Sequence, residues 1–552
     1  MRRRIALGLL VLPAIVLSCA PAEDDFERAA LDEVEELSES LANDLHALSV
    51  AVRGREPTAI EKYVAETIRV ESFPTRPGAT QPVFKWIGGH DWTVDPSSPP
   101  LRDREAFLSS LEELLDHFSE IEDVRFKVKQ AEFDPARDGY GSAHVKIFII
   151  GRDDRGKREW LKAWLRIEVL RAGEEPWRIT ALDVESMESK VADRDLFSEV
   201  ALPARISTIF PPFGVGANSG FVSHGAAVAD VNGDGLLDVA ATGVEQNYLY
   251  LNRGDGRFDD VSADSLVGFA PPGSGALFLD YDNDGDADLF LAAAGNQMLL
   301  QNRWREEGQV KFWDVSEAAG VSLPAVGFSA AAADVNGDGL PDIYVASYNH
   351  YGTVMPNSWG KATNGTPNLL FLNHEDGRFR EVGAEWGVAD GRWTYAAAFA
   401  DLDQDGDQDL YLANDFGENA YYRNDGDRFV EIAAELGIVD PGFGMGVSFG
   451  DYDNDGDLDL HVTNMSSTAG NRILKRLYPA EERNAANLEK LASGNSLYEN
   501  LGDGRFKDVT AAAGGFASGW AFGGGFFDLD NDGWEDLYTP NGFISGKSLK
   551  DT

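Results

Sequence analysis

The chain has 552 residues, with 48 Lys or Arg against 93 Asp or Glu, and its net charge is −45. Such an acidic chain is excluded as a nucleic-acid binder, because binding a phosphate backbone requires a basic patch. The length predicts two or more domains, and the single cysteine, Cys19, excludes an intrachain disulfide.

Residues 1–19 have the pattern of a lipoprotein signal peptide. MRRR is basic, the fourteen residues IALGLLVLPAIVLS are apolar, and Cys19 follows them directly. An apolar run of this length is too short to cross a bilayer. VLSC resembles a bacterial lipobox, which implies lipidation of Cys19, membrane attachment through that lipid, and a periplasmic or surface-exposed place in the cell envelope. An ordinary signal cleaved nearby is the alternative.

Residues 20–200 predict a small α+β domain. Helical spacing of apolar residues appears in 26–53, 59–68 and 104–121. Strand-like runs follow at 124–133, 142–151, 160–170 and 177–187.

This element order resembles the SnoaL-like (nuclear-transport-factor-2-like) cone, which implies an enclosed pocket. The residues expected to line that pocket, if they are not ordinary core or surface residues, are His90, Trp92, His117, His144, Trp160 and Trp164.

The motif D-x-[DN]-x-D-G-x-x-D occurs six times between residue 230 and residue 536. Side-chain oxygens at positions 1, 3, 5 and 9, a backbone carbonyl at position 7 and a turn-forming glycine at position 6 suit a hard cation with six to eight oxygen ligands. An oxygen-only set favours Ca²⁺ over a transition metal, so we expect about six structural Ca²⁺ ions. An EF-hand would need an acid at position 12, where the copies carry Ala241, Leu291, Val345, Leu412, Val462 and Thr539. The alternative for one such loop, an acidic surface turn, does not account for six copies in register.

The predicted ligands are Asp230, Asn232, Asp234, Leu236 and Asp238; Asp280, Asp282, Asp284, Asp286 and Asp288; Asp334, Asn336, Asp338, Leu340 and Asp342; Asp401, Asp403, Asp405, Asp407 and Asp409; Asp451, Asp453, Asp455, Asp457 and Asp459; and Asp528, Asp530, Asp532, Trp534 and Asp536.

Short strand-like runs flank each acidic loop, and a second hairpin such as YLYLNRGDGRFDDV follows most of them. Four strands in each repeat of about fifty residues are typical of a β-propeller blade. The fold class is therefore mainly β, with a β-propeller of six or seven four-stranded blades over residues 203–552, preceded by the α+β domain.

The chain from Pro203 onward resembles FG-GAP (VCBS-type) repeat proteins, in particular the cartilage-acidic-protein-like (ASPIC/UnbV) group. The resemblance rests on the DYDNDGDLDL-type loops, on YLANDFGENAYYRNDGDRF and on the recurring RF-x-[DE]-[VI] strand. It implies a calcium-loaded propeller used for adhesion or recognition, commonly of seven blades, and no single activity. The sixth copy stops at NGFISGKSLKDT, before its second hairpin, and no ASPIC/UnbV C-terminal region follows. ARISTIF (204–210) is a candidate strand to close the ring from the N-terminal side.

Two long insertions, 347–368 and 464–495, fall between the second and third strands of their blades. Alternate turns of a meander lie at opposite ends, so we expect these insertions on the face opposite the calcium loops, where long loops often carry function. The predicted recognition residues on that face are Tyr348, Tyr351, Trp359, Trp393, Tyr395, Phe443 and Trp520; the alternative for each is packing between blades.

These features favour a calcium-stabilised binding or adhesion lipoprotein with a glycan, peptide or envelope partner. The competing prediction is an envelope enzyme, of hydrolase or lyase type, with its site in the propeller funnel or the N-terminal cone. The sequence contains no G-x-S-x-G elbow, P-loop, H-E-x-x-H or dinucleotide fingerprint, so it favours binding over catalysis.

Overall fold

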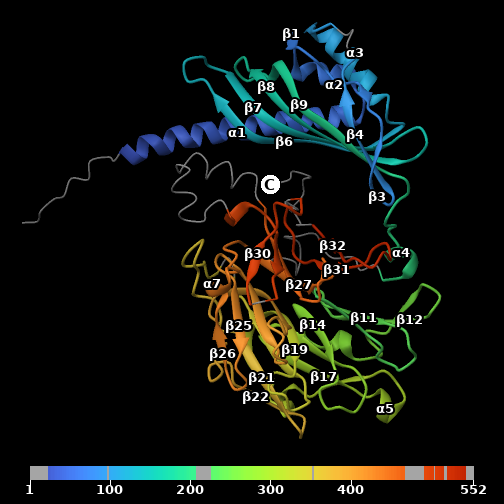
Figure 1. The fold of residues 1–552 in the computed structure, drawn as a ribbon, viewed down its shortest axis with the longest axis vertical. Coiled ribbons are helices and arrows are strands. Elements are labelled where there is room, and N and C mark those ends of the chain that lie inside the picture. The colour runs from blue at the N-terminus through green and yellow to red at the C-terminus, as the bar shows by residue number, and fades with distance from the viewer. Residues whose placement is uncertain are drawn as a thin grey trace, which may run out of the picture. The chain divides into compact units, whose positions relative to one another are not determined.

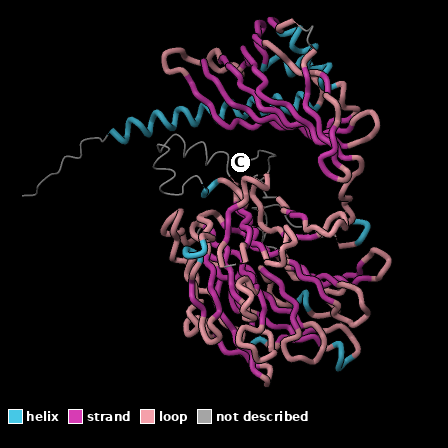
Figure 2. Tube along the Cα trace, in the orientation of Figure 1, coloured by secondary structure: helices cyan, strands magenta, loops and turns pink. Residues whose placement is uncertain are grey.

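The computed structural model describes residues 23–95, 99–206, 225–350, 353–466, 490–502, 504–514 and 519–541. Two compact units, Met1–Ser198 and Glu199–Thr552, make up the chain, and strands dominate both (Figure 2). The predicted signal segment with Cys19 lies outside the described residues. Among the helices that are described, none is both long and apolar enough to span a bilayer.

In the first unit, helices pack against one face of a mainly antiparallel sheet in which β4, β9, β8, β7 and β6 are successive neighbours (Figure 1). Its elements in chain order are α1 (Glu23–Arg53), α2 (Pro57–Ile60), η1 (Glu61–Tyr63), β1 (Val64–Val70), β2 (Arg76–Pro77), β3 (Gln81–Phe84), β4 (Ile87–Thr93), β5 (Leu101–Asp103), α3 (Arg104–Leu115), β6 (Glu120–Phe133), β7 (Tyr140–Arg152), β8 (Arg158–Leu170) and β9 (Arg178–Ala192).

Alternation along the strands decides which face of this sheet is buried. On β8, Leu161, Ala163 and Leu165 are buried, whereas Trp160 on the other face is 46% exposed. The buried face packs against apolar side chains of α1 and α3. The helix α3 begins at an aspartate N-cap, where the Asp103 carboxylate accepts a hydrogen bond from the Ala106 amide at 2.9 Å. The predicted α+β domain is confirmed in its main elements.

The prediction of a helix over 59–68 is wrong. Helix is limited to α2 (Pro57–Ile60) and the 3-10 turn η1 (Glu61–Tyr63), and Val64–Val70 forms β1, which pairs with β9 and β5. Val64, Ile68 and Val70 are fully buried. These β-branched residues fit a strand better than a helix, and the pairing partners that favour the strand come from residues far along the chain.

The second unit is a β-propeller, which confirms the predicted fold class. Five complete blades and the first two strands of a sixth lie within the described residues. The strands of the first three blades are β10 (Ala226–Ala229), β11 (Asp238–Ala241), β12 (Tyr248–Asn252) and β13 (Phe258–Asp260); β14 (Gly275–Leu279), β15 (Asp288–Ala292), β17 (Met298–Asn302) and β18 (Phe312–Asp314); and β19 (Pro324–Ala333), β20 (Asp342–Ser347), β21 (Leu369–His374) and β22 (Arg378–Glu381).

The strands of the next three blades are β23 (Trp393–Ala400), β24 (Asp409–Asp415), β25 (Ala420–Asn424) and β26 (Phe429–Glu431); β27 (Gly444–Gly450), β28 (Asp459–Asn464), β29 (Ser496–Asn500) and β30 (Phe506–Asp508); and β31 (Gly525–Phe527) with β32 (Asp536–Tyr538). The remaining elements are α4 (Ala201–Ala204), η2 (Val267–Phe269), β16 (Ala294–Asn296, paired with β19), α5 (Trp304–Glu307), α6 (Ser316–Ala319), α7 (Ala433–Leu436) and η3 (Lys490–Ala492).

The first strand of each blade contacts the first strand of the next, from β10 through β14, β19, β23 and β27 to β31. Small residues permit this close approach, as in the AAAA run that ends β19. A Cβ on Gly275 of β14 would lie 2.8 Å from the Phe328 carbonyl oxygen of β19. Larger apolar side chains of the second and third strands form separate clusters between successive blades. Each blade therefore shares its core with its neighbours.

Two expectations about the ends of the ring fall outside the described residues. They concern 207–210 of the proposed closing segment ARISTIF and 542–552, the end of the sixth copy. The start of ARISTIF is not a strand, because Ala204 ends α4 and Arg205 has φ 65°.

A pair of substitutions on β8 tests which sheet face is the core of the first unit. We expect Leu161→Ala to destabilise that unit by about 2–5 kcal/mol, because it removes a fully packed side chain. Trp160→Ala is the matched control and should change the stability by less than about 1 kcal/mol. Hydrogen exchange of the full chain, read separately over residues 23–198, measures both. Equal loss of protection in the two variants would contradict the assignment.

Candidate metal sites and ligand face

The six acidic loops are the turns between the first and second strands of the blades, and they share one backbone geometry. In the loop at 334–342, Asp334 accepts hydrogen bonds from the Asp338 amide at 3.0 Å and the Gly339 amide at 2.8 Å. Gly339, at position 6, has φ 86°, a left-handed conformation that glycine adopts without strain. The position-1 carboxylate therefore shapes the turn before any ion binds.

The position-9 aspartate is the first residue of each second strand. It lies inside the protein in the first five blades, whereas Asp536 in the sixth is half-buried. Asp238, Asp288, Asp342, Asp409 and Asp459 are at most 1% exposed. Each uses one carboxylate oxygen to accept a hydrogen bond from the position-2 amide of its own loop. The other oxygen accepts one from the amide of an asparagine at the end of the third strand. Position 9 thus joins the metal loop to the body of its blade.

The side chains of these asparagines connect neighbouring blades. Asn424 donates from Nδ2 to the Val335 carbonyl of the preceding blade at 2.8 Å, and Asn373 donates to the Tyr281 carbonyl in the same way at 2.7 Å. Asn302 and Asn500 repeat the contact at 2.8 and 3.1 Å. Each acceptor is the position-2 residue of the preceding loop, so hydrogen bonds link successive loops from the first blade to the fifth.

These interblade asparagines were not predicted as functional residues. Their signal in the sequence is the Asn that opens each second hairpin turn, as in YLYLNRGDG and LLFLNHEDG. Read alone, that Asn indicates only a turn, because the acceptor lies in another blade.

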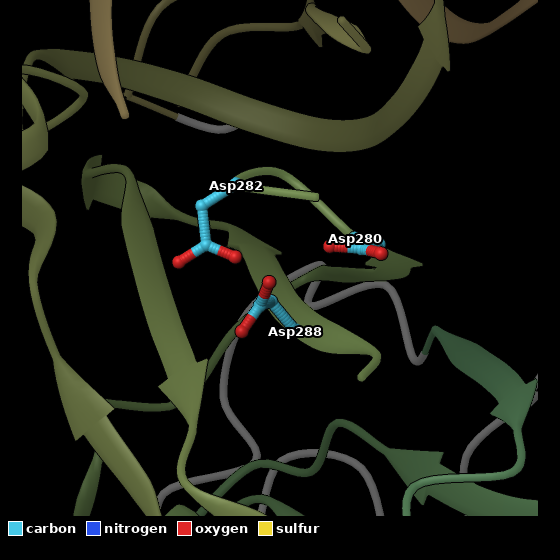
Figure 3. Close-up of side chains that lie close together, drawn as sticks. All are labelled: Asp280, Asp282 and Asp288. Atoms are coloured by element: carbon cyan, nitrogen blue, oxygen red, sulfur yellow. The ribbon is translucent and has the colours of Figure 1, made fainter. Parts of the chain in front are cut away.

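The carboxylates at positions 1, 3 and 9 converge where position 3 is an aspartate. Their oxygens lie within 4.8 Å of one another in the loops that begin at Asp280, Asp401, Asp451 and Asp528. Figure 3 shows Asp280, Asp282 and Asp288 gathered at the turn between β14 and β15. In the loops at 230 and 334, Asn232 and Asn336 hold position 3. In the second loop, Asp284 and Asp286 at positions 5 and 7 form a further acidic group with Glu306, which was not predicted.

Several loop oxygens lack a hydrogen-bond donor. Asp280 Oδ1, Asp282 Oδ1 and Asp453 Oδ1 are buried and accept no hydrogen bond within the described part of the chain. Buried polar atoms are normally satisfied, and converging carboxylate oxygens are the ligands that hard cations prefer. The residues therefore fit a metal ion, and the predicted position 1, 3 and 9 ligands are brought together in the four loops that carry aspartate at position 3.

Burial raises the pKa of the position-9 carboxyls above the ordinary value for aspartate. The raised pKa values are about 9 for Asp288, about 7 for Asp342 and Asp459, and about 6 for Asp409. Neighbouring loop aspartates raise them further. A bound cation would favour the charged form of these same groups.

The insertion after β20 lies at the end of its blade opposite the metal loop. The strands β19 to β22 pair antiparallel in sequence order, so the β20–β21 connection and the β19–β20 turn occupy opposite ends. The predicted separation of the two faces holds for this blade. Most of the second insertion, residues 467–489, lies outside the described residues.

The predicted recognition residues divide into buried and exposed members. Trp393 is fully buried and Tyr348 is 5% exposed, and both belong to an apolar cluster that half-buried Tyr395 and Phe443 contact. A buried ring cannot contact a ligand at the surface, so the prediction is wrong for Trp393 and Tyr348, which pack between blades. Trp359 is 58% exposed.

The two remaining predicted residues are Trp520 and Tyr351. Trp520 is half-buried, and its backbone pairs antiparallel with that of Met465. Tyr351 lies outside the described residues.

Side-chain amides hold the insertion in one conformation. Asn364 accepts hydrogen bonds from the Trp393 indole N–H at 2.9 Å and the Asn357 amide at 3.0 Å, and it donates to the Met355 carbonyl at 2.9 Å. The Ala362 amide donates to the Phe416 carbonyl at 3.0 Å. The buried tryptophan thus anchors the loop that displays Trp359.

The residues predicted to line a pocket in the first unit do not do so. The cavity there, about 70 Å³, is lined by apolar side chains such as Leu45, Phe107 and Leu161. His144, Trp160 and Trp164 lie on the opposite face of the sheet, because their positions alternate with those of the cavity-lining residues.

His90, Trp92 and His117 do come together, around the buried carboxylate of Glu159. The Nε2 atoms of His90 and His117 lie 3.3 and 2.7 Å from Glu159 oxygens, and the Trp92 and His117 ring centroids are 5.0 Å apart. The hydrogen bond to Glu159 raises the pKa of His117, and burial lowers that of His90.

Family comparisons match the repeats. The model for FG-GAP-like repeats matches residues 230–291, 280–345, 358–412, 401–462 and 487–539, and the FG-GAP repeat model matches 326–365. Cartilage acidic protein 1 from Mus musculus is 25% identical over 250 residues, which cover 42% of this chain and 38% of that protein. The Homo sapiens protein is 24% identical over 251 residues, covering 42% and 37%. The chain therefore spans about two fifths of the length of these curated relatives.

Two solved structures resemble parts of the chain at low similarity. An Agrocybe aegerita lectin that recognises non-reducing terminal N-acetylglucosamine aligns over 81% of this chain and 91% of its own, with 14% identity and a TM-score of 0.30. A putative scytalone dehydratase from Novosphingobium aromaticivorans aligns over 31% of this chain and 99% of its own, with 12% identity and a TM-score of 0.20. Scores this low show no shared function.

Asn424 and Asn252 provide a matched test of the interblade contact. Asn424→Ala leaves the buried Val335 carbonyl without its donor and should lower the stability of the second unit by about 1–3 kcal/mol. Asn252 occupies the same place in the first blade, but its Nδ2 donates to Leu237 of its own blade at 3.0 Å. We expect a smaller loss for Asn252→Ala in urea unfolding of the full chain. Equal losses would show that the contact between blades adds no stability.

The raised carboxyl pKa values predict different pH responses with and without Ca²⁺. Between the ordinary value near 4 and the raised values of about 6 to 9, the unfolded chain binds fewer protons than the native metal-free chain. Its free energy of unfolding should therefore fall as the pH rises through this range. With saturating Ca²⁺ the native ligands are deprotonated, as they are in the unfolded chain above about pH 5, so stability should stay nearly constant as the pH rises further.

Thermal unfolding at several pH values, in chelator and in Ca²⁺, measures both responses. Asp288→Asn should flatten the pH dependence in chelator, whereas the exposed Asp264→Asn control should not. A chelated protein that gains stability as the pH rises would refute the assignment.

Proposed function

Because residues 230–539 carry FG-GAP-like repeats, we propose that this chain is a calcium-stabilised binding protein of the bacterial cell envelope. In this proposal Ca²⁺ occupies the six acidic loops, a lipid on Cys19 attaches the protein to the membrane, and the insertion 353–368 displays the recognition surface. Similarity to cartilage acidic protein 1 supports a protein of this repeat class.

Calcium is the proposed ion because the converging ligands are oxygens. At about 1 mM Ca²⁺ and a Kd of about 10⁻⁴ M, each site contributes roughly 1.4 kcal/mol by mass action. Several such sites together approach the whole net stability of an ordinary domain, about 5–15 kcal/mol. We therefore assign the ions a structural role at the end of the blades away from the ligand.

The observation that carries the proposal is a rigid loop that exposes large apolar side chains. Trp359 and Met355 are 58% and 52% exposed, although Asn364 and Asn357 fix the backbone around them by hydrogen bonds. The exposure of this tryptophan to water does not stabilise the free protein. In a complex, a rigid aromatic side chain contributes much of the binding energy at little entropic cost.

Two exposed tryptophans at opposite ends of the blades test the assigned face. We expect Trp359→Ala to weaken binding of the full chain to isolated bacterial cell envelopes by about tenfold or more. Trp534 is 53% exposed and lies in a metal loop. Trp534→Ala should leave binding unchanged. Sedimentation with the envelopes in saturating Ca²⁺ measures both, and thermal unfolding checks that both variants fold. If neither substitution changes binding, the insertion is not the recognition surface.

A further inference from the structure

We infer that a pocket beside Trp359 binds the terminal sugar of an uncharged glycan. The inference rests on the proposed binding function and names its ligand class. The pocket has a volume of about 320 Å³ and lies between the insertion 353–368 and the connections that precede β23 and β25. This volume is at the lower end of the range of small-molecule sites, about 300–1,000 Å³. It accommodates one end of a chain rather than an extended ligand.

The pocket wall holds a guanidinium in a fixed position. Arg392 donates from Nε to Asp390 at 2.8 Å, and its Nη2 lies 2.8 Å from the same carboxylate. Tyr422 also donates to Asp390, at 2.8 Å. The Asp390 side chain is only 4% exposed, whereas that of Arg392 is 24% exposed. The second terminal nitrogen, Nη1, makes only a long 3.5 Å contact with the Glu418 carbonyl, so it can donate to a ligand.

The other polar groups of the pocket complement this donor. Lys361 Nζ and Glu418 Oε1 form an ion pair at 3.0 Å, with side chains 75% and 35% exposed. The Thr363 hydroxyl accepts a hydrogen bond from Asn357 at 3.1 Å, which leaves its own proton to donate. Donors and acceptors therefore face the same space.

The charge balance favours an uncharged ligand. Lys361 and Arg392 carry two positive charges, and Asp390 and Glu418 carry two negative charges, so the lining is neutral. An anion would lie beside Glu418 and a cation beside Arg392, with no spare opposite charge for either. Sugar hydroxyls both donate and accept, so a pyranose can bond to groups of each kind without adding charge.

An exposed aromatic side chain belongs to the same insertion as the pocket-lining residues 361–363. Trp359 is two residues from Lys361 and packs edge-on against Phe416, with ring centroids 5.3 Å apart and planes at 71°. Its large exposed fraction leaves an amphipathic ring for the apolar face of a sugar. Thr363 belongs to the same hydrogen-bond network that holds the insertion, because its backbone amide donates a hydrogen bond to Asn357 Oδ1 at 3.0 Å. The pocket is thus formed before the ligand arrives.

The test is binding of the full chain, in saturating Ca²⁺, to a printed array of uncharged and acidic oligosaccharides. We expect uncharged glycans to bind, and titration calorimetry with the strongest of them to give an affinity. Thr363→Val and Lys361→Gln should each weaken that affinity by about tenfold, the effect of one lost hydrogen bond. Arg428→Gln, a change to an arginine that is 67% exposed at the other end of the same blade, is the control and should have no effect. Unchanged melting temperatures show that each variant folds.

The outcomes separate this inference from the proposed function. An array that binds only acidic glycans, or glycan binding unaffected by both pocket substitutions, overturns the inference. If the array shows no binding while Trp359→Ala still abolishes binding to envelopes, the ligand is a peptide or protein. In that case the pocket inference falls and the proposed function stands. Glycan binding that depends on Thr363 supports the inference even if the envelope experiment fails.

Discussion

The propeller depends on the hydrogen bonds of the buried aspartate at position 9 of its first five repeats. In the first five blades its two oxygens accept amide hydrogen bonds from the metal loop and from the third strand. From the second blade to the fifth, the asparagine that gives the second bond also donates to the preceding loop. Metal binding and blade-to-blade packing therefore use the same groups. A cation that holds Asp342 in its charged form would strengthen contacts in the blade on each side, as expected for hydrogen-bond networks in a low-dielectric interior.

This arrangement explains why the recognition surface we propose lies at the other end of the blades. At the metal end, asparagine side chains connect each loop from the first to the fourth to the blade that follows it. The insertion 353–368 instead takes its rigidity from Asn364 and from the buried indole of Trp393. The insertion does not have to supply metal ligands, unlike the acidic loops. Exposed Trp359 and the pocket-lining residues of the insertion therefore occupy positions that the fold does not restrict to particular residues.

The first unit offers a different chemistry. Its cavity, at about 70 Å³, is smaller than the roughly 150 Å³ of an engineered cavity that binds benzene, and its lining contains no acid or base. A group of titratable side chains lies instead in the compact His90–Glu159–His117 cluster. An acid–base enzyme could use that cluster but not the cavity, because the apolar residues that line the cavity supply no proton donor or acceptor.

The sequence by itself determined the repeats, the four-stranded blades and the ligand positions 1, 3 and 9. A metal loop is local, so the spacing of its glycine and its oxygen ligands can be recognised within nine residues. The sequence also located the insertion that exposes Trp359. Only the tertiary structure decided that Trp393 is a buried anchor, that Val64–Val70 is a strand, and that Asn424 bonds to the blade before its own. In each of these cases the deciding partner lies at least 29 residues away. Burial and long-range pairing arise from contacts that no local pattern contains, whereas turn chemistry is complete within the turn.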